Sequence, residues 1–177
     1  MKNLITPLNK EKIKNLKAGD EVLLSGVIYT ARDQAHKRLV SDIGKGIGRG
    51  KGFNIKDAVI YYCGPTGTPV GKVIGSCGPT TSSRMDIFTP YLLKKGLKAM
   101  IGKGRRSKET VLAIKRYKAV YFLAPAGCGA LIAKHIKKAS TVAYNDLGPE
   151  RILRLEVEDL PLIVAVDSKG GNIYGKN

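Results

Sequence analysis

Short apolar runs of strand length recur along this chain of 177 residues. The first, Glu21–Thr30 (EVLLSGVIYT), is rich in β-branched residues, and a second, 58–63 (AVIYYC), stops at the turn residues Gly64-Pro65. Runs this short, bounded by turn residues, are typical of strands buried in a folded domain. Further strands are predicted at 97–101, 119–123, 140–144, 152–157 and 162–166, with Pro161 expected to keep the last two apart.

Helical patterns alternate with these strands. Residues 32–43 (RDQAHKRLVSDI) and 129–138 (GALIAKHIKK) have helical composition, and four hydroxyl residues, 80–83, precede the pattern MDIFTPYLLKKG. Serine and threonine side chains cap helices, so a capped helix is predicted there, with Pro90 in an early turn or at a break. The alternation predicts an α/β fold with a mixed, partly parallel sheet and covering helices.

A single domain covering residues 1–177 is expected, because 43% hydrophobic content in a chain of this length supports one well-buried core. The compositionally odd segment is Gly44–Gly52 (GKGIGRGKG), a basic glycine-rich loop. Lys45 and Gly52 stand where a P-loop needs glycine and a hydroxyl residue, and Arg49 stands where a dinucleotide fingerprint needs its last glycine. A solvated loop without a defined role is favoured over a mobile basic lid or an RNA-contacting loop.

The net charge of +17 predicts an anionic partner, such as nucleic acid, an anionic membrane or a small carboxylate, and charge alone does not choose among them. No apolar run approaches 18 residues, and the first twenty residues contain none of signal-peptide length. A cytoplasmic protein that does not enter a membrane is therefore expected.

Three cysteines, Cys63, Cys77 and Cys128, form no CxxC pair, so reduced and buried thiols are the expected state. Three thiolates would suffice for a four-iron cluster with one open iron, but these spacings match no ferredoxin pattern. No spacing of histidine, cysteine and carboxylate residues supports a zinc site, and no metal ligand is assigned to this chain.

The most informative polar segment is 78–84 (GPTTSSR). A hydroxyl-rich turn that enters a helix presents free amide N–H groups and the positive end of the helix dipole, which together bind an anion. Arg84 would lie in the first helical turn, where the dipole disfavours a cation, and this placement suggests a task such as pairing with a carboxylate. An ordinary capped helix with an exposed arginine is the alternative.

Two further cations occupy strand ends, where ligand-contacting residues gather in α/β folds. Lys103 lies between two glycines after the strand at 97–101, and Arg32 follows the first strand with Asp33 beside it. A solvated turn lysine and a surface salt bridge are the alternatives. His36 could bind a carboxylate or assist proton transfer, or it could be a structural histidine.

Residue types alone therefore indicate a cationic pocket for a small anion. RNA binding is the rival function, although aromatic content is only 6%, tryptophan is absent and no RNP or KH signature is visible. A basic RNA-binding module without catalysis is kept as the alternative to an enzyme.

A series of blocks between about Leu16 and Tyr174 carries a family resemblance. The blocks are KAGDEVLLSGVIYTARDQAHKRL, VIYYCGPT, IGSCGPTTSSRMDIFTPYLL, GLKAMIGKG and FLAPAGCGALIAKHIKKASTVAYNDLGPERILRLEVEDLPLIVAVDSKGGNIY. Several blocks in order are more specific than any lone motif. With these blocks the chain resembles the beta subunit, or the equivalent C-terminal domain, of class I iron–sulfur fumarate hydratases and L-tartrate dehydratases.

The resemblance implies a swivelling β/β/α domain and an active site completed by an alpha subunit, in an alpha2beta2 heterotetramer. The [4Fe-4S] cluster would be bound by that alpha subunit and not by this chain. The implied reaction is the reversible addition or removal of water on a small dicarboxylate, with fumarate/malate the first expectation and tartrate the second. Nucleic acid is not an expected partner under this interpretation.

The resemblance also implies roles for individual residues. Thr80 would be the catalytic base for the carbon-bound proton, and His36 and Thr81 would have auxiliary roles. A threonine hydroxyl is a weak base, so neighbouring cations would need to lower its pKa. Three cations would bind the substrate carboxylates: Arg32, Arg84 and Lys103.

Overall fold

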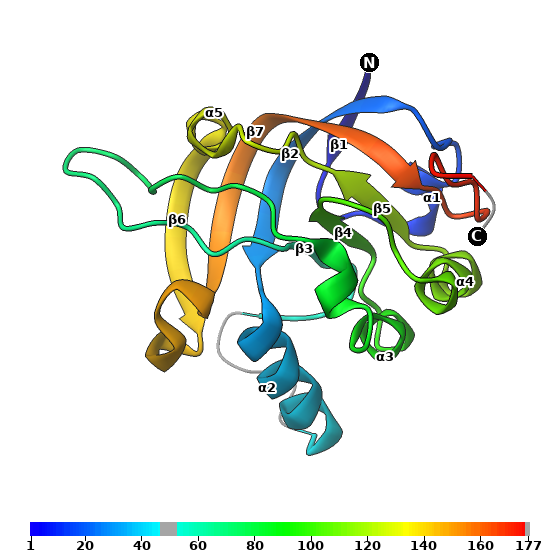
Figure 1. Cartoon of the computed structure of the whole chain (residues 1–177), viewed down its shortest axis with the longest axis horizontal. Coiled ribbons are helices and arrows are strands. Elements are labelled where there is room, and N and C mark those ends of the chain that lie inside the picture. Colours follow the sequence, from blue (N-terminus) through cyan, green and yellow to red (C-terminus); the bar gives the residue numbers. More distant parts are fainter. Residues whose placement is uncertain (47–52, 176–177) are drawn as a thin grey trace.

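Within residues 1–46 and 53–175, which the computed structural model describes, the chain folds around a seven-stranded sheet (Figure 1). The strand order is β1-β2-β3-β4-β5-β7-β6, and an additional pairing of β2 with β7 closes β2, β3, β4, β5 and β7 into a barrel. The strands are β1 (Lys2–Ile5), β2 (Glu21–Thr30), β3 (Val59–Tyr61), β4 (Ala99–Gly102), β5 (Val120–Leu123), β6 (Ile136–Ala143) and β7 (Ile152–Val166).

The sheet is mixed, as predicted. Neighbouring strands from β1 to β5 run parallel, whereas β7 is antiparallel to β2, β5 and β6. The prediction of a mixed α/β fold is therefore confirmed. The helices are α1 (Lys10–Ile13), α2 (Asp33–Gly44), α3 (Thr89–Lys94), α4 (Lys108–Tyr117) and α5 (Gly129–Lys134), with 3₁₀ turns η1 (Ser82–Met85) and η2 (Asn145–Glu150).

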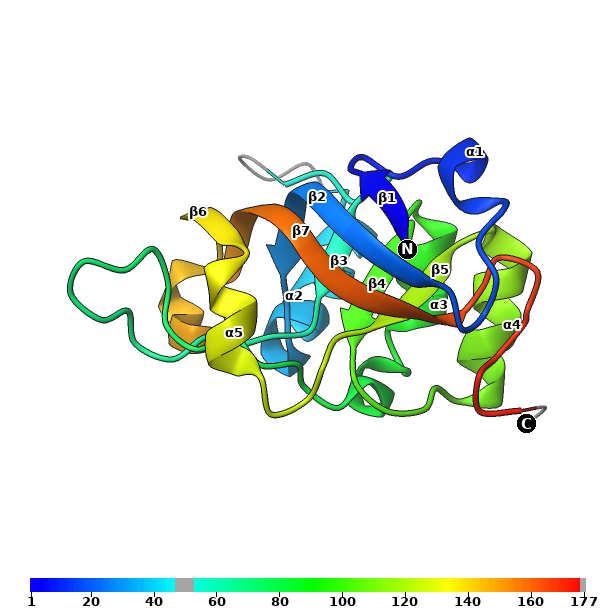
Figure 2. The ribbon, with the colours of Figure 1, turned by 90° about the horizontal axis from the view of Figure 1, so that it is seen from above.

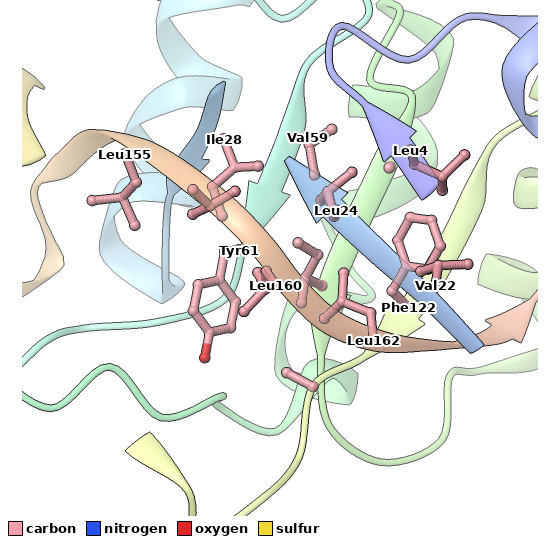
Figure 3. Packing of buried hydrophobic residues seen from close by; sticks show 14 of the residues in the cluster. Leu4, Val22, Leu24, Ile28, Val59, Tyr61, Phe122, Leu155, Leu160 and Leu162 are labelled. Atoms are coloured by element: carbon pink, nitrogen blue, oxygen red, sulfur yellow. The ribbon is translucent and has the colours of Figure 1, made fainter. Parts of the chain in front are cut away.

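Two hydrophobic cores lie on opposite faces of the parallel strands. Val59 and Tyr61 of β3 belong to the core inside the barrel (Figure 3). Ile60 between them belongs to the core outside it. On β5, Phe122 lies inside and Tyr121 outside. Successive side chains of a strand point to opposite faces, so a strand buried on both faces needs an unbroken apolar run. The runs AVIYYC and AVYFL have this property.

Three helices cover the outer face of the barrel. Leu39 of α2, Leu92 of α3 and Ile114 of α4 all belong to the outer core. Figure 1 shows these three helices along one side of the sheet, and Figure 2 shows α5 and β6 at the opposite end of the molecule from α4. The described residues contain no helix with the length and apolar character needed to cross a membrane.

The carboxyl ends of β2, β3, β4 and β5 lie at one edge of the sheet, because these strands are parallel. The chain leaves this edge at Arg32 after β2, at Tyr62 after β3 and at Lys103 after β4. Residues 64–79 then form a long excursion that extends away from the sheet (Figures 1 and 2). The edge therefore collects segments that are far apart in the sequence.

Several predicted elements are confirmed. The strand at Glu21–Thr30 is β2 with the same bounds, and the helix predicted at 32–43 is α2, with Arg32 as its N-cap. The strands predicted at 58–63, 97–101 and 119–123 correspond to β3, β4 and β5. The helix α4 was not predicted, although Ser107 caps it by accepting a hydrogen bond from the amide of Thr110.

Two predictions in the last third of the chain are wrong. The strands expected at 152–157 and 162–166 form one continuous strand, β7. Pro161 fits because β6 pairs only as far as Val157 and β5 pairs only from Ile163, so this part of β7 is ladder-paired with β2 alone. The helix expected at 129–138 ends at Lys134, where β6 takes over and pairs with β7.

The prediction of a capped α-helix starting directly after residues 80–83 is also wrong. Ser82–Met85 is a short 3₁₀ turn, and the α-helix begins only at Thr89, with Pro90 in its first turn. Thr81, the N-cap of η1, makes no side-chain capping hydrogen bond. Most of the predicted basic loop, residues 47–52, lies outside the described part of the chain.

Candidate active site

The segment 80–84 is joined by backbone hydrogen bonds to the carboxyl ends of β3 and β4. The amide of Thr80 donates to the carbonyl oxygen of Tyr62 at 2.7 Å, and the amide of Ser82 donates to that of Lys103 at 2.9 Å. The amide of Lys103 donates in turn to the carbonyl oxygen of Thr80 at 3.3 Å, and Thr81 forms a parallel bridge with Lys103. The three predicted residues Thr80, Thr81 and Lys103 are therefore neighbours.

These bonds remove two amide groups from the predicted anion site. The amides of Thr80 and Ser82 are already bonded to carbonyl oxygens, so they do not point at a ligand. The turn that follows is a single 3₁₀ turn rather than a long helix with a strong dipole. A helix dipole therefore contributes little to anion binding at this edge.

Close approach at this edge depends on small residues. A Cβ on Gly102, the last residue of β4, would collide with the side chain of Ser82. A Cβ on Gly64 would lie 2.8 Å from Nη1 of Arg32. Glycine at both positions lets the backbone pass directly against the segment 80–84 and against Arg32.

The two predicted arginines meet at one carboxylate. Arg84 donates from Nε to Oδ1 of Asp33 at 3.0 Å and from Nη2 to Oδ2 at 2.7 Å, a bidentate pair. Nε of Arg32 lies 4.0 Å from Oδ2 of the same Asp33. The side chain of Arg84 is half exposed, whereas those of Arg32 and Asp33 are about three-quarters buried. The structure thus brings together Arg32, at the start of α2, and Arg84 of η1.

A second carboxylate, Glu150 of η2, reaches the same place. Its Oε2 accepts a hydrogen bond from the amide of Gln34 at 2.7 Å, and its Oε1 lies 3.9 Å from Nη2 of Arg32. Within the described part of the chain, the buried Nε of Arg32 has no hydrogen-bond partner. Arg32 is therefore held near two carboxylates while part of its donor capacity is unused.

Lys103 occupies a different wall of this edge. Its exposed side chain lines a cleft of about 510 Å³ together with apolar residues that follow β5 and residues of β7. Arg32, Thr80 and Arg84 lie outside that lining. The six predicted residues therefore share one edge of the sheet without lining one closed pocket in this chain.

His36 is completely buried one helical turn after Arg32. Its Nδ1 lies 2.8 Å from the carbonyl oxygen of Arg32, and its ring packs edge-on against Tyr62. Because a carbonyl oxygen only accepts, Nδ1 carries the proton, and the buried Nε2 has no partner among the described residues. Burial lowers the pKa of His36 from 6.5 to about 4, so its ring is neutral at pH 7.

Protonation of His36 is expected to lower the free energy of unfolding by about 3 kcal/mol between pH 6.5 and pH 4. The unfolded chain takes up the proton near pH 6.5, whereas the folded chain resists protonation until about pH 4. The free energy of unfolding therefore keeps its full value above pH 6.5 and decreases as the pH falls toward 4. Urea unfolding at several pH values should show this decrease in the wild-type chain and a smaller one in His36→Phe. His135→Gln, which keeps His36, should retain the full decrease, and an equal decrease in His36→Phe would contradict the assignment.

Two of the three cysteines lie in an environment that does not suit an iron–sulfur cluster. Cys63 and Cys77 are buried with their sulfur atoms 2.9 Å apart, and the pKa of Cys63 is raised by its hydrogen bond to Cys77 and by burial. Cluster ligands must be thiolates, which this environment disfavours. Among the described residues, no group of three or more histidine, cysteine or acidic side chains is placed to hold a metal ion.

A buried polar network that the sequence did not predict lies beneath the site. Arg106 donates from Nε to Oδ1 of Asp86 at 2.6 Å and from Nη2 to Oγ1 of Thr89 at 2.8 Å, and its guanidinium lies over the ring of Tyr121. The hydroxyl of Tyr121 donates to the carbonyl oxygen of Gly104 at 2.8 Å and lies 2.9 Å from Oγ of Ser82. The network fixes the segments on both sides of the Thr81–Lys103 bridge. In sequence, Arg106 is one more basic residue in GKGRRSK, so nothing marked it as buried.

The sequence matches one family along almost its whole length. Residues 2–177 match the model of the family described as Fumarase C-terminus. The chain therefore belongs to this family.

Three relatives are named as dehydratases or hydratases. A protein of Methanocaldococcus jannaschii, provisionally named L(+)-tartrate dehydratase subunit beta, is 39% identical over 98% of this chain and 91% of its own length. The L(+)-tartrate dehydratase subunit beta of Escherichia coli K12 is 32% identical over 99% of this chain and 88% of its own length. The aerobic class I fumarate hydratase of the same organism is 36% identical over 98% of this chain but only 31% of its own length. The chain thus spans most of a beta subunit and less than a third of the longer fumarate hydratase.

Proposed function

We propose that this chain is the beta-type subunit of a hydro-lyase that reversibly adds water to a small dicarboxylate or removes water from it. The observation that carries the proposal is the position of Arg32, Lys103 and the segment that carries Arg84 at the carboxyl ends of the parallel strands β2, β3 and β4. The chain also aligns with dehydratase and hydratase relatives over nearly its full length. Fumarate/malate is the first substrate pair to test and tartrate the second.

The cations fit the charge that such a reaction develops. Removing a proton from the carbon next to a carboxylate places a second negative charge on that carboxylate, giving an enolate-like dianion. Arginine and lysine donors held in a site without bulk water stabilise this charge more than they stabilise the substrate. Arg84 and Arg32 would bind and orient one carboxylate, and Lys103 on the neighbouring wall would contact the other.

Thr80 is the proposed base. Its backbone is fixed between Tyr62 and Lys103 by bonds that leave its hydroxyl unused. Cations brought close to that hydroxyl in the assembled site would favour the alkoxide form that a threonine base requires. Thr81 and His36 are proposed to have auxiliary roles. Thr81 forms the backbone bridge to Lys103, and the neutral ring of His36 donates a hydrogen bond from Nδ1 to the carbonyl oxygen of Arg32.

The other half of the site is assigned to a partner. We assign the [4Fe-4S] cluster to an alpha subunit, because the buried, paired thiols of Cys63 and Cys77 do not fit it. We propose an alpha2beta2 heterotetramer in which residues 1–177 act as one swivelling β/β/α domain. The two relatives named subunit beta support a separate partner chain. The relatives reported above are named for dehydration and hydration chemistry, so the RNA-binding alternative receives no support from them.

Co-expression tests the proposal directly. The chain would be purified anaerobically with its candidate alpha subunit, the cluster reconstituted, and interconversion of fumarate, malate and tartrate measured. Turnover is expected only when both chains and the cluster are present. The variant Arg84→Ala should lower kcat/KM at least about tenfold, because it removes a charge-assisted pair. Arg38→Ala, which removes a cation of α2 that is paired with Asp146 of η2, is the control.

Two results would count against the proposal. One is full turnover in the Arg84→Ala enzyme. The other is a chain that forms no complex, shows no turnover and instead binds RNA with an affinity that falls steeply as salt rises.

A further inference from the structure

Asp33 occupies an unusual position for an acidic residue in a site that must bind dianions. It is the first residue of α2, immediately after the predicted ligand Arg32, and its side chain is about three-quarters buried. Both of its carboxylate oxygens are bonded to Arg84, which lies 51 positions away in the sequence. A carboxylate that only repelled the substrate would weaken binding. The position of Asp33 beside two arginines therefore suggests that it contributes to substrate binding through them.

The geometry of the pair identifies that role. A guanidinium has five N–H donors in one plane, and Asp33 uses Nε and one donor of Nη2. In the described part of the chain, the remaining end of the guanidinium, formed by Nη1 and the second donor of Nη2, has no protein acceptor. That end has the same fork spacing and can receive a second carboxylate in the same plane. Asp33 thus leaves Arg84 able to bind substrate while fixing the direction in which it can do so.

Arg84 needs such support because it lacks other restraints. Its side chain is half exposed, and it stands in a 3₁₀ turn of only four residues. A free arginine side chain has many rotamers, and holding it in one of them before the substrate arrives removes that entropic cost from binding. Asp33 is itself rigid, because it lies in the first turn of α2, a favourable place for an acid, and the amide of the next residue is held by Glu150.

On the basis of the proposed function, we propose that Asp33 is a positioning residue that orients the guanidinium of Arg84 for the substrate carboxylate. Asp33 does not touch the reacting atoms, and it is not a base, because both of its oxygens are engaged by Arg84. Its effect is carried through Arg84, which bonds both of its oxygens, rather than through Arg32, whose Nε lies 4.0 Å from Oδ2 without a hydrogen bond. This dependence separates Asp33 from a residue that merely stabilises the fold.

The test uses the assembled enzyme with its alpha subunit and the single and double variants Asp33→Asn, Arg84→Ala and Asp33→Asn/Arg84→Ala. We expect Asp33→Asn to raise KM for the dicarboxylate roughly tenfold with kcat changed less than about twofold, because a lost orientation mainly weakens carboxylate binding. In the Arg84→Ala background, the same change should alter kcat/KM by less than about twofold.

The chain offers a matched control. Asp146 of η2 also forms a bidentate pair, with Nη1 and Nη2 of Arg38 on α2, and both oxygen to nitrogen distances are 2.7 Å. Asp146→Asn removes an equivalent ion pair and should leave both KM and kcat unchanged. Asp33→Glu, which keeps the charge, should recover part of the lost affinity.

The outcomes separate this inference from the proposed function. Absence of turnover by the wild-type complex would overturn the proposed function, and with it the role of Asp33. Turnover that needs Arg84, together with an unchanged or lowered KM in Asp33→Asn, would overturn the positioning role alone. So would a loss in Asp33→Asn that simply adds to the loss in Arg84→Ala.

Discussion

The assembled enzyme carrying Thr80→Val is expected to lose roughly 10²- to 10⁴-fold in kcat with little change in KM, which is the range a positioned base contributes. Valine has nearly the shape of threonine and lacks only the hydroxyl. The backbone of Thr80 is fixed by bonds to Tyr62 and Lys103 that do not involve its side chain. The substitution should therefore remove the base without moving the cations around it.

Isotope exchange makes this test specific. When the enzyme works in deuterated water, the proton on the substrate carbon should exchange rapidly in the wild-type complex and hardly at all in Thr80→Val. Ser83→Ala, which removes an exposed hydroxyl from the same segment, is the control and should exchange normally. If Thr80→Val retained wild-type exchange and turnover, the base would have to be another group, and Thr80 would be left with a structural role.

The parts of the fold that could be predicted from sequence are those with a local signal. The barrel strands β3, β4 and β5 are buried on both faces, so their unbroken apolar runs identify them. Closure of the barrel has no such signal, because it depends on the pairing of β2 with β7, elements that are more than 120 residues apart. Pro161 was misinterpreted for the same reason: its effect depends on which strands lie beside it.

In the candidate site, too, only the residues with a local sequence signal could be predicted. Arg32 and Lys103 could be selected because each directly follows a strand, and parallel strands end at a common edge. Arg84 is selected from the sequence because it follows a segment expected to form an anion-binding helix terminus. In the structure it stands in a short 3₁₀ turn and forms a bidentate pair with Asp33. The roles of Asp33 and Arg106 could not be predicted from the sequence, because each residue acts through a partner that only the fold brings close.

The buried pair of Arg106 and Asp86 gives the largest expected effect on stability. Asp86→Ala should lower the free energy of unfolding by about 3–5 kcal/mol, the usual cost of removing one partner from a buried pair. Arg106 has no exposed side-chain surface, and Asp86 accepts hydrogen bonds both from it and from the amide of Ser107. Without the carboxylate, the buried guanidinium of Arg106 would lose its counter-charge, and the amide of Ser107 at the start of α4 would lose its acceptor. Urea unfolding of the purified chain, followed by circular dichroism, measures this change.

A second variant distinguishes lost charge balance from simple loss of packing. In Asp86→Ala/Arg106→Met the buried charge is also removed, so the double variant should be more stable than Asp86→Ala alone, because apolar replacement of a buried ion pair is often nearly neutral. Asp146→Ala, which breaks an ion pair in solvent, should change stability little. If the double variant were less stable than the single one by the full cost of a second substitution, Arg106 would stabilise the fold through its contacts with Tyr121 and Thr89 rather than through its charge. The site segments that this network supports, 80–86 and 103–107, would then depend on the packing of Arg106 itself.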